Sequence, residues 1–428
     1  MFDIFSLLTM IGGLALFLYG MNVMGDGLAK MAGGKLERIL EKLTSTPIMG
    51  VLLGFLVTAV IQSSSATTVM VVGFVNSGIM KLSQAISIIM GANIGTTATA
   101  WILSLAGLEG SNVFVKLLKP TSFSPVLALI GVVMIMFAKK AKKKDLGTIL
   151  IGFAILMFGM DTMTNAIKPL AEVAWFKELL VKFSNPILGL MAGAILTAII
   201  QSSSASVGIL QAMSMNGLIT FGTAFPIIMG QNIGTCVTAM ISSVGASKNG
   251  KRTAFVHLYF NLIGTAIFMA AFYAINAFVD FSFMEGTISG TGIAILHSVF
   301  NISATLVLLP CRNLLEKLAC LTVRDKEEEV VVDSEIQLLD YRFLDKPSFA
   351  VEQCRNVAHK MAELSKDAIF KAMSLLKNYD EGIAEEVVHL EGVVDKYEDQ
   401  LGSYLVKLSG KATSEEDSRT VSLMLHSI

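Results

Sequence analysis

The sequence has little charge, few cysteines and none of the short motifs that mark common enzymes. Charged residues make up 16% of its 428 positions and hydrophobic residues 53%, a balance unlike that of an ordinary soluble enzyme. The four cysteines have neither a metal-ligand spacing nor a disulfide framework (Cys236, Cys311, Cys320, Cys354). Nucleotide loops, zinc motifs and nucleophile elbows are also missing, so we expect neither an enzyme nor a nucleic-acid partner.

We expect no cleaved signal peptide at the start of the chain, because no basic segment precedes its first apolar run. That run extends from Ile4 to about Met24, which is long enough to span a membrane. Charge is concentrated at the other end of the chain. Residues 1–310 carry 18 basic and 11 acidic side chains, whereas residues 311–428 carry 15 and 23. We interpret this as a membrane domain followed by a soluble domain.

The apolar part contains one polar motif twice. Gln62-Ser63-Ser64-Ser65-Ala66 and Gly91-Ala92-Asn93-Ile94-Gly95-Thr96 recur 139 residues later as Gln201-Ser202-Ser203-Ser204-Ala205 and Gly230-Gln231-Asn232-Ile233-Gly234-Thr235. Hydroxyl and amide clusters in apolar sequence are costly unless they bind something. The duplication therefore points to a solute site at the interface of two repeats.

Apolar segments near the length of a spanning helix, about 20 residues, occur at 5–27, 84–105, 122–138, 147–167, 222–244, 254–279 and 291–309. The stretches 48–78 and 187–217 are each interrupted by their Gln-Ser-Ser-Ser run. Arms of about 15 residues reach roughly 22 Å as helix, less than a hydrocarbon core of about 30 Å. We expect re-entrant hairpins or discontinuous helices there, because such backbone is tolerated only where protein or a polar cavity surrounds it.

Lysine-rich loops indicate the orientation. The loops 139–144 and 248–252 are both predicted to be cytoplasmic, which places the N-terminus outside and the C-terminal domain in the cytoplasm. This scheme puts 13 Lys and Arg residues in inner loops and five in outer loops. It also places three crossings between equivalent points of the two repeats. We therefore expect the second repeat to be inverted relative to the first, with a parallel duplication around a static pore as the alternative.

The polar clusters offer ligands of two kinds. Hydroxyl and amide oxygens suit a hard cation, and hydroxyl, amide and free backbone N–H groups suit an anion. A half-helix that starts after a break presents unpaired N–H groups and a partial positive charge. Neither cluster contains Lys or Arg, so an anion there would need this dipole together with co-bound cations. The candidate ligands are Gln62, Ser63, Ser64, Ser65, Thr67, Asn93, Thr96, Gln201, Ser202, Ser203, Ser204, Asn232 and Thr235.

Several of these residues have a structural interpretation as well. Serines also let membrane helices pack closely, and Asn93 and Asn232 suit a helix break or cap as well as ligand contact. Asp161 is an acid within a span, which makes it a candidate for the coupling ion, although neighbouring hydroxyls would also satisfy it.

Other small and polar residues are assigned to packing. We interpret Gly50-x-x-x-Gly54 and Gly189-x-x-x-Gly193 as seams between helices that bind no ligand. His257 and His297, in or near late spans, are expected to form hydrogen bonds between helices.

At the duplicated motif the chain resembles the sodium–phosphate cotransporter family, whose hallmark is a QSSS motif in each of two inverted repeats. Gln62–Ser65 and Gln201–Ser204 match it, and the resemblance covers about residues 5–310. It implies Na⁺-coupled symport of inorganic phosphate across the cytoplasmic membrane by alternating access, with Na⁺ and phosphate around these eight residues and no organic cofactor. A transporter of another oxyanion or small carboxylate, a phosphate channel, a phosphate sensor and a homo-oligomer stay open.

The polar tail resembles a PhoU-like regulator. After an acidic linker from Asp325 to Asp345, amphipathic helices are predicted at 349–377 and 381–409, and a third begins near Ser414. In that resemblance the pattern continues beyond Ile428, so we expect the domain in this sequence to be incomplete. Glu391-x-x-x-Asp395 matches an acidic metal motif of that fold, although such a pair is usually a solvated helix face.

Taken together, the sequence predicts an all-α polytopic membrane protein that lies in the lipid bilayer, has two inverted repeats with broken helices and ends in a soluble helical domain. The expected divisions are repeat 1 (1–120), a connecting span and basic loop (121–146), repeat 2 with terminal spans (147–310), a linker (311–347) and the PhoU-like domain (348–428).

Overall fold

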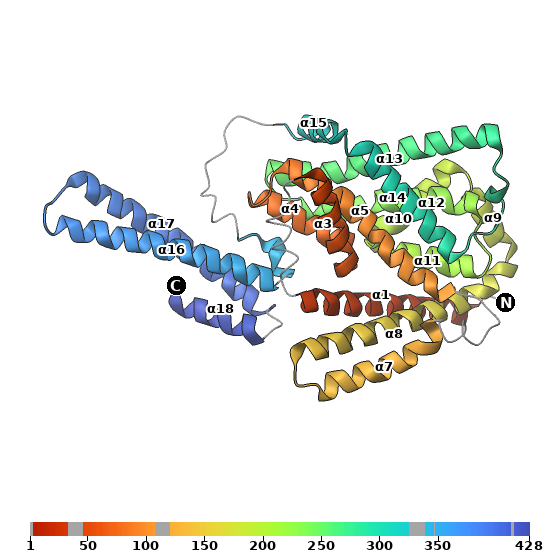
Figure 1. Cartoon of the computed structure of the whole chain (residues 1–428), viewed down its shortest axis with the longest axis horizontal. Helices are drawn as coiled ribbons and strands as arrows, with labels where there is room; N and C mark the ends of the chain where they lie inside the picture. The colour runs from red at the N-terminus through yellow and green to blue at the C-terminus, as the bar shows by residue number, and fades with distance from the viewer. Residues whose placement is uncertain (1–2, 33–45, 108–119, 325–338, 346, 412–414) are drawn as a thin grey trace. The chain divides into compact units, whose positions relative to one another are not determined.

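The computed structural model describes residues 3–32, 46–107, 120–324, 339–345, 347–411 and 415–428 (Figure 1). In these ranges it is built from helices, apart from an isolated bridge between Thr220 and Thr287. The chain divides into two compact units. The first comprises residues 1–72 and 82–324, and the second comprises residues 73–81 and 325–428. The all-α prediction is confirmed.

Six helices of the described ranges are long and apolar enough to cross a membrane. They are α1 (Ile4–Ala32), α5 (Leu82–Ser104), α8 (Ala141–Ile167), α12 (Phe221–Ser242), α13 (Lys248–Val279) and α14 (Gly290–Leu308). A seventh span results if α9 (Ala174–Lys182) and α10 (Pro186–Ile200), which meet at 104°, are counted together. The segment expected at 122–138 is α7 (Pro120–Phe137), one of the shorter apolar helices. The chain is thus a multi-pass membrane protein.

Both stretches that contain the repeated motif are broken where the sequence predicts. Helix α3 (Pro47–Ile61) ends at Gln62 and α4 (Ser64–Asn76) follows, while α10 ends at Gln201 and α11 (Ser203–Met215) follows. The φ angles of Gln62 and Gln201 are 59° and 56°. This left-handed conformation closes a helix, and it is uncommon for a residue other than glycine. The same strained turn therefore occurs in both copies.

Glycine seams hold each broken pair against the next helix. Gly54 of α3 lies so close to α5 that an added Cβ would be 2.0 Å from the carbonyl oxygen of Ile88. At Gly193 of α10 the corresponding distance is 2.1 Å, to the carbonyl oxygen of Ile227 in α12. Backbones this close exclude any side chain at these positions. The prediction that these glycines form packing seams is confirmed.

The seams also show that the broken stretches are hairpins. Gly189 near the start of α10 packs on Pro226 of α12, and Gly234 further along α12 packs on Thr197. The two helices therefore run in the same direction with their first turns at one level. Since the chain leaves α10 at the far end and must begin α12 at the near end, α11 runs back between them. The pairing of α3 with α5 requires the same of α4, so the re-entrant geometry is confirmed.

The contact between α1 and α8 shows how the two repeats are related (Figure 1). Gly20 of α1 packs on the backbone of Leu156, and Gly159 of α8 packs on the backbone of Phe17. The 139-residue offset makes Gly20 equivalent to Gly159 and Phe17 equivalent to Leu156. Two equivalent helices thus meet antiparallel through the same contact made twice, which defines a two-fold axis across them. For helices that span a membrane this axis lies in the membrane plane, so the second repeat is inverted.

An apolar core joins the repeats at this axis. Phe17, Met157 and Met160 are fully buried within it. The ring of Phe17 also covers Gly208 of α11, so the return helix of repeat 2 is packed on the first helix of the chain.

The end of the first unit contains a helix within the expected linker. Helix α15 (Arg312–Thr322) packs on α13, where the guanidinium of Arg252 donates two hydrogen bonds, of 3.0 and 2.9 Å, to the carbonyl oxygen of Val323. Short 3-10 turns occupy Leu105–Gly107, Lys168–Glu172, Ser282–Met284 and Tyr341–Asp345. Most of the expected acidic linker lies outside the described residues.

The second unit contains α16 (Pro347–Leu375), α17 (Glu381–Ser409) and α18 (Glu415–Ser427), which confirms the three predicted helices. Its core includes the buried hydroxyl of Tyr404, which donates a 2.8 Å hydrogen bond to the carbonyl oxygen of Asp340. Burial raises the pKa of the Cys354 thiol from its ordinary value near 9 to about 12, so this cysteine is inert in the folded unit.

Candidate functional site

In the first copy of the motif the side chains are tied to neighbouring helices. Gln62 is buried, with its Nε2 donating to the carbonyl oxygen of Ala59 and its Oε1 accepting from Thr99 of α5 at 3.0 Å. The hydroxyl of Thr58 donates to that of Thr67 at 3.0 Å, across the break. Side chains of the first cluster are thus hydrogen-bonded within the broken pair and to α5.

The start of each return helix presents free donors. The Ser63 hydroxyl accepts from the N–H of Ala66 at 3.1 Å, whereas the N–H groups of Ser64 and Ser65 have no partner in the described ranges. In the second copy Ser202 accepts in the same way from the N–H three residues on, at 3.2 Å. Each helix therefore offers two N–H groups and two serine hydroxyls at its positive end, the arrangement that binds an anion without a basic residue.

The second cluster lacks the cross-links of the first. Gln201 is exposed, where Gln62 is buried. Three hydroxyls are buried without a hydrogen-bond partner among the described residues: Thr197, Ser206 and Thr238, which are the equivalents of the bonded Thr58, Thr67 and Thr99. Buried polar groups are normally paired. The second cluster therefore has buried hydroxyls that a ligand could use, in addition to the free N–H groups that both helix starts share.

Asn93 and Asn232 occupy matching positions in the middle of α5 and α12. Each Nδ2 donates to a carbonyl one turn back, that of Ile89 at 3.0 Å and that of Ile228 at 3.1 Å. Both helices run unbroken through these residues, so the interpretation as a helix break or cap is wrong. An asparagine bonded to its own helix through Nδ2 leaves its Oδ1 to face a neighbour.

The threonines of these segments behave differently from the serines. The hydroxyl of Thr96 donates to the carbonyl of Ala92 at 3.2 Å, and that of Thr235 donates to the carbonyl of Gln231 at 2.9 Å. Their donor capacity is therefore used within their own helices, which leaves the oxygen lone pairs as the group they offer a ligand.

Helix α5 bonds to the first cluster and to α11, the helix that begins at the second cluster. Gln62 bonds to Thr99, and the carbonyl of the adjacent Ala100 accepts a 3.0 Å hydrogen bond from Nε2 of Gln211 in α11. Gln211 also donates to the carbonyl of Gly290 at 3.0 Å. The described residues show no direct hydrogen bond between the clusters. Sequence analysis did not single out Gln211. Its amide side chain lies in an apolar helix where the equivalent residue of the first repeat is Val72, and this difference could have indicated it.

The remaining ionisable residues take less central places. Asp161 is exposed on α8 and accepts a 3.1 Å hydrogen bond from Asn165, so it is not brought to either cluster and its coupling role stays a prediction. His297 forms the expected contact between helices, with Nε2 3.3 Å from Oδ1 of Asn232. The ring of His257 has no partner in the described ranges, contrary to expectation.

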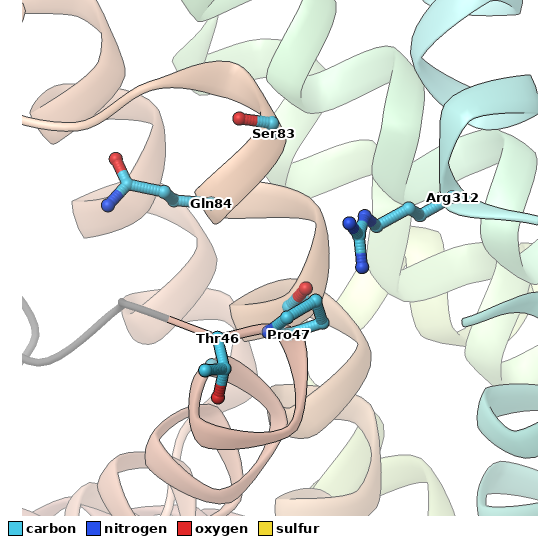
Figure 2. Close-up of a pocket in the computed structure, with 7 residues that line it drawn as sticks. Thr46, Pro47, Ser83, Gln84 and Arg312 are labelled. Atoms are coloured by element: carbon cyan, nitrogen blue, oxygen red, sulfur yellow. The ribbon is translucent and has the colours of Figure 1, made fainter. Parts of the chain in front are cut away.

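A cavity of about 120 Å³ lies at the opposite end of α3 from Gln62 (Figure 2). Thr46 and Pro47 line it from the start of α3, Ser83 and Gln84 from the start of α5, and Arg312 from the start of α15. The length of α3 separates it from the break by about 22 Å. It is therefore distinct from the repeated motif.

The described residues contain no group of three or more His, Cys, Asp and Glu side chains that could hold a metal ion. Glu391 and Asp395 are both exposed on α17.

Comparison with known proteins finds relatives over the whole chain. A protein of Bacillus subtilis, uncharacterized protein YqeW, is 31% identical over 311 residues, 72% of this chain and 96% of its own length. The putative inorganic phosphate export protein YjbB of Escherichia coli K12 is 24% identical over 421 residues, 97% of this chain and 73% of its own length. Sodium-dependent phosphate transport protein 2A of the rat is 41% identical over 99 residues, 22% of this chain and 15% of its own length. No solved structure matches.

Two family models account for most of the sequence. The PhoU domain model matches residues 358–428. The model described as Na⁺/Pi-cotransporter matches twice, at residues 16–165 and 155–293, which agrees with the two inverted repeats. The chain therefore belongs to the Na⁺/Pi-cotransporter family.

Proposed function

We propose that this protein carries inorganic phosphate across the cytoplasmic membrane together with Na⁺, by alternating access of a site built from both repeats. The observation that carries the proposal is the pair of serine-capped helix starts, each with free N–H groups at Ser64 and Ser65 or at their equivalents. They occur in inverted repeats, the arrangement typical of secondary transporters.

Charge explains why a cation travels with the anion. A helix N-terminus is equivalent to about half a positive charge, so two of them supply about one. Inorganic phosphate near neutral pH is a mixture of the monoanion and the dianion, and the dianion exceeds the charge of the two helix ends by about one unit. Since neither cluster contains Lys or Arg, the difference has to be met by co-bound cations if the loaded site is to cross an apolar environment. Neutral oxygens suit Na⁺ for this task.

The direction of transport is a separate question. The Escherichia coli and Salmonella typhimurium relatives are named putative phosphate export proteins, which favours export as a second candidate. The inverted repeats give the two membrane faces similar geometry, so the fold itself does not fix a direction. For a symporter, the combined Na⁺ and phosphate gradients do so.

The test is transport of radiolabelled phosphate by the purified full chain in proteoliposomes. We expect an inward Na⁺ gradient to drive accumulation above the external concentration, and an equal K⁺ gradient to fail. Unlabelled phosphate should compete, whereas sulfate and small carboxylates should not. Flux that never concentrates phosphate would contradict symport and indicate a channel. Phosphate binding without flux would indicate a sensor, and phosphate release that does not depend on Na⁺ would favour an exporter of another type.

A further inference from the structure

The last two membrane helices contain a repeat of their own, separate from the QSSS motif. His257, Asn261 and Thr265 of α13 recur 40 residues later as His297, Asn301 and Thr305 of α14. Residues four apart lie on one face of a helix, so each set forms a polar stripe about two turns long in an otherwise apolar span. No charged residue occurs in segments 253–279 and 286–311.

Both polar stripes face the interior of the membrane unit. The exposed fractions of Asn261 and Asn301 are 0%, and those of Thr265 and Thr305 are 3% and 4%. Other faces of the two helices carry exposed apolar side chains such as Leu262, Ile267, Ile302 and Leu306. The polar groups are thus withdrawn from the surrounding lipid, and their cost must be met by something inside the protein.

The stripes come together with α12. A Cβ at Gly264 of α13 would lie 3.1 Å from the Cβ of Ala304 in α14, so Thr265 and Thr305 are each adjacent to a close contact between these two helices. On the α12 side, Nδ2 of Asn261 lies 3.4 Å from the sulfur of Cys236. The bond between His297 and Asn232 joins α14 to the same helix one turn away.

The free atoms of this group are mainly hydrogen-bond acceptors. Nδ2 of Asn261 donates to the carbonyl of His257 at 3.0 Å, and Nδ2 of Asn301 donates to that of His297 at 2.9 Å. Because a carbonyl only accepts, the amide orientation follows, and the atom left without a partner among the described residues is Oδ1 in each case.

The threonine hydroxyls support the same conclusion. Thr253, also on α13 and fully buried, donates to the carbonyl of Asn249 at 2.8 Å. Thr265 and Thr305 make no such bond and have no other partner in the described ranges. Two amide oxygens and two hydroxyl oxygens are therefore left over in a buried region without any charged side chain.

We propose that Asn261, Thr265, Asn301 and Thr305 supply ligands for Na⁺, forming a coupling-ion site beside α12 and distinct from the QSSS motifs. The proposal rests on the Na⁺-coupled function inferred above and assigns part of that coupling to α13 and α14. A hard monovalent cation satisfies several neutral oxygens at once, whereas a divalent ion would usually require carboxylates. The contact between His297 of α14 and Asn232 links this site to α12, the helix that follows the second broken pair.

The test measures Na⁺ binding without phosphate. Purified full chain in detergent is titrated with NaCl against choline chloride, and binding is read as a rise in the temperature of unfolding. The variants are Thr265→Val and Thr305→Val, which remove only a hydroxyl, with Thr253→Val as the matched control. We expect each test variant to raise the half-saturating Na⁺ concentration about tenfold, as for the loss of one ligand, and the control to leave it unchanged.

A second pair of variants guards against misfolding. Asn261→Asp keeps an oxygen ligand and should retain the Na⁺ response, whereas Asn261→Leu should raise the half-saturating Na⁺ concentration about tenfold, as the threonine variants do. Absence of any Na⁺ response in the wild type, or an unchanged half-saturating concentration in the Thr265→Val/Thr305→Val double variant, would overturn the site. If the double variant keeps its Na⁺ affinity while wild-type liposomes show Na⁺-driven phosphate uptake, the site is wrong and the transport proposal stands. If the double variant loses its Na⁺ affinity while wild-type liposomes show no Na⁺-driven phosphate uptake, the Na⁺ site stands and the phosphate transport proposal is wrong.

Discussion

Gln62 and Gln201 have the same neighbours in sequence and the same left-handed backbone, yet their side chains lie in different surroundings. The buried Gln62 bonds to Thr99, whereas Gln201 is exposed and Thr238, the equivalent of Thr99, has no partner in the described ranges. The sequence predicts the break and the equivalence of the two residues, because both follow from local pattern. It does not predict the asymmetry, because that depends on which neighbouring helix each side chain meets.

The serines that follow the glutamines give a prediction at this scale. Ser64 and Ser203 are buried at the first turn of their return helices, so Ser64→Ala and Ser203→Ala each remove one donor from the proposed anion site. We expect phosphate affinity to fall by the value of one contact, about 1–3 kcal/mol, while the protein still inserts and folds. The measurement is the phosphate concentration for half-maximal uptake in liposomes.

Thr162→Val serves as the control for the serine variants, because Thr162 is half-buried and its hydroxyl bonds to a carbonyl of its own helix. Equal phosphate and Na⁺ affinities in both serine variants and the wild type would remove the QSSS clusters from the site.

At the scale of the helices, glycines decide which backbones touch. The GxxxG spacing at Gly50–Gly54 and Gly189–Gly193 was enough to predict the seams, and the structure supplies their partners in α5 and α12. The helices through Asn93 and Asn232 were harder to predict. An asparagine followed two residues later by glycine suits a helix end, but here its side chain bonds to the preceding turn and the helix continues.

Helix α1 allows a matched comparison of two glycines. A Cβ at Gly20 would lie 2.2 Å from the backbone nitrogen of Leu156, whereas one at Gly12 would meet nothing within 4 Å. We expect Gly20→Ala to separate α1 from α8 and destabilise the protein by about 1–3 kcal/mol. Gly12→Ala should be neutral or stabilising by up to about 1 kcal/mol, since alanine is the better helix former. Thermal unfolding of the two variants in detergent measures the difference, and equal melting temperatures would contradict the seam.

For the whole molecule, the arithmetic of lysine-rich loops predicted the inversion that the contact between α1 and α8 confirms. This worked because charge asymmetry between loops reports which side of the membrane they face. Loop charges do not predict which buried polar groups lack a hydrogen-bond partner. All fourteen buried side-chain nitrogen and oxygen atoms without a partner in the described ranges lie between Thr197 and Thr305, although the polar motif itself is shared equally by both repeats.

The predicted orientation can be tested with single cysteines in a variant whose four native cysteines are replaced. Asp3→Cys should react with a membrane-impermeant maleimide added to intact cells, because the N-terminus is expected outside. Lys142→Cys and Lys248→Cys should react only after permeabilisation, because both basic loops are expected in the cytoplasm. Labelling of Lys142→Cys and Lys248→Cys from opposite sides would refute the topology. Labelling of both from outside, with Asp3→Cys reacting only after permeabilisation, would reverse it.

The paired contact between Gly20 and Leu156 and between Gly159 and Phe17 has a consequence for how the two halves can change over time. Each half provides the surface against which the other packs. A larger residue at position 20 therefore clashes with the backbone of the other half at position 156, and a change in its own copy at position 159 does not relieve the clash. Divergence of the halves is therefore restrained along this axis and freer away from it, where Gln62 and Gln201 already differ. In a duplicated chain of this kind, the contact between α1 and α8 keeps its symmetry, whereas the residues near the proposed ligands can differ between the halves.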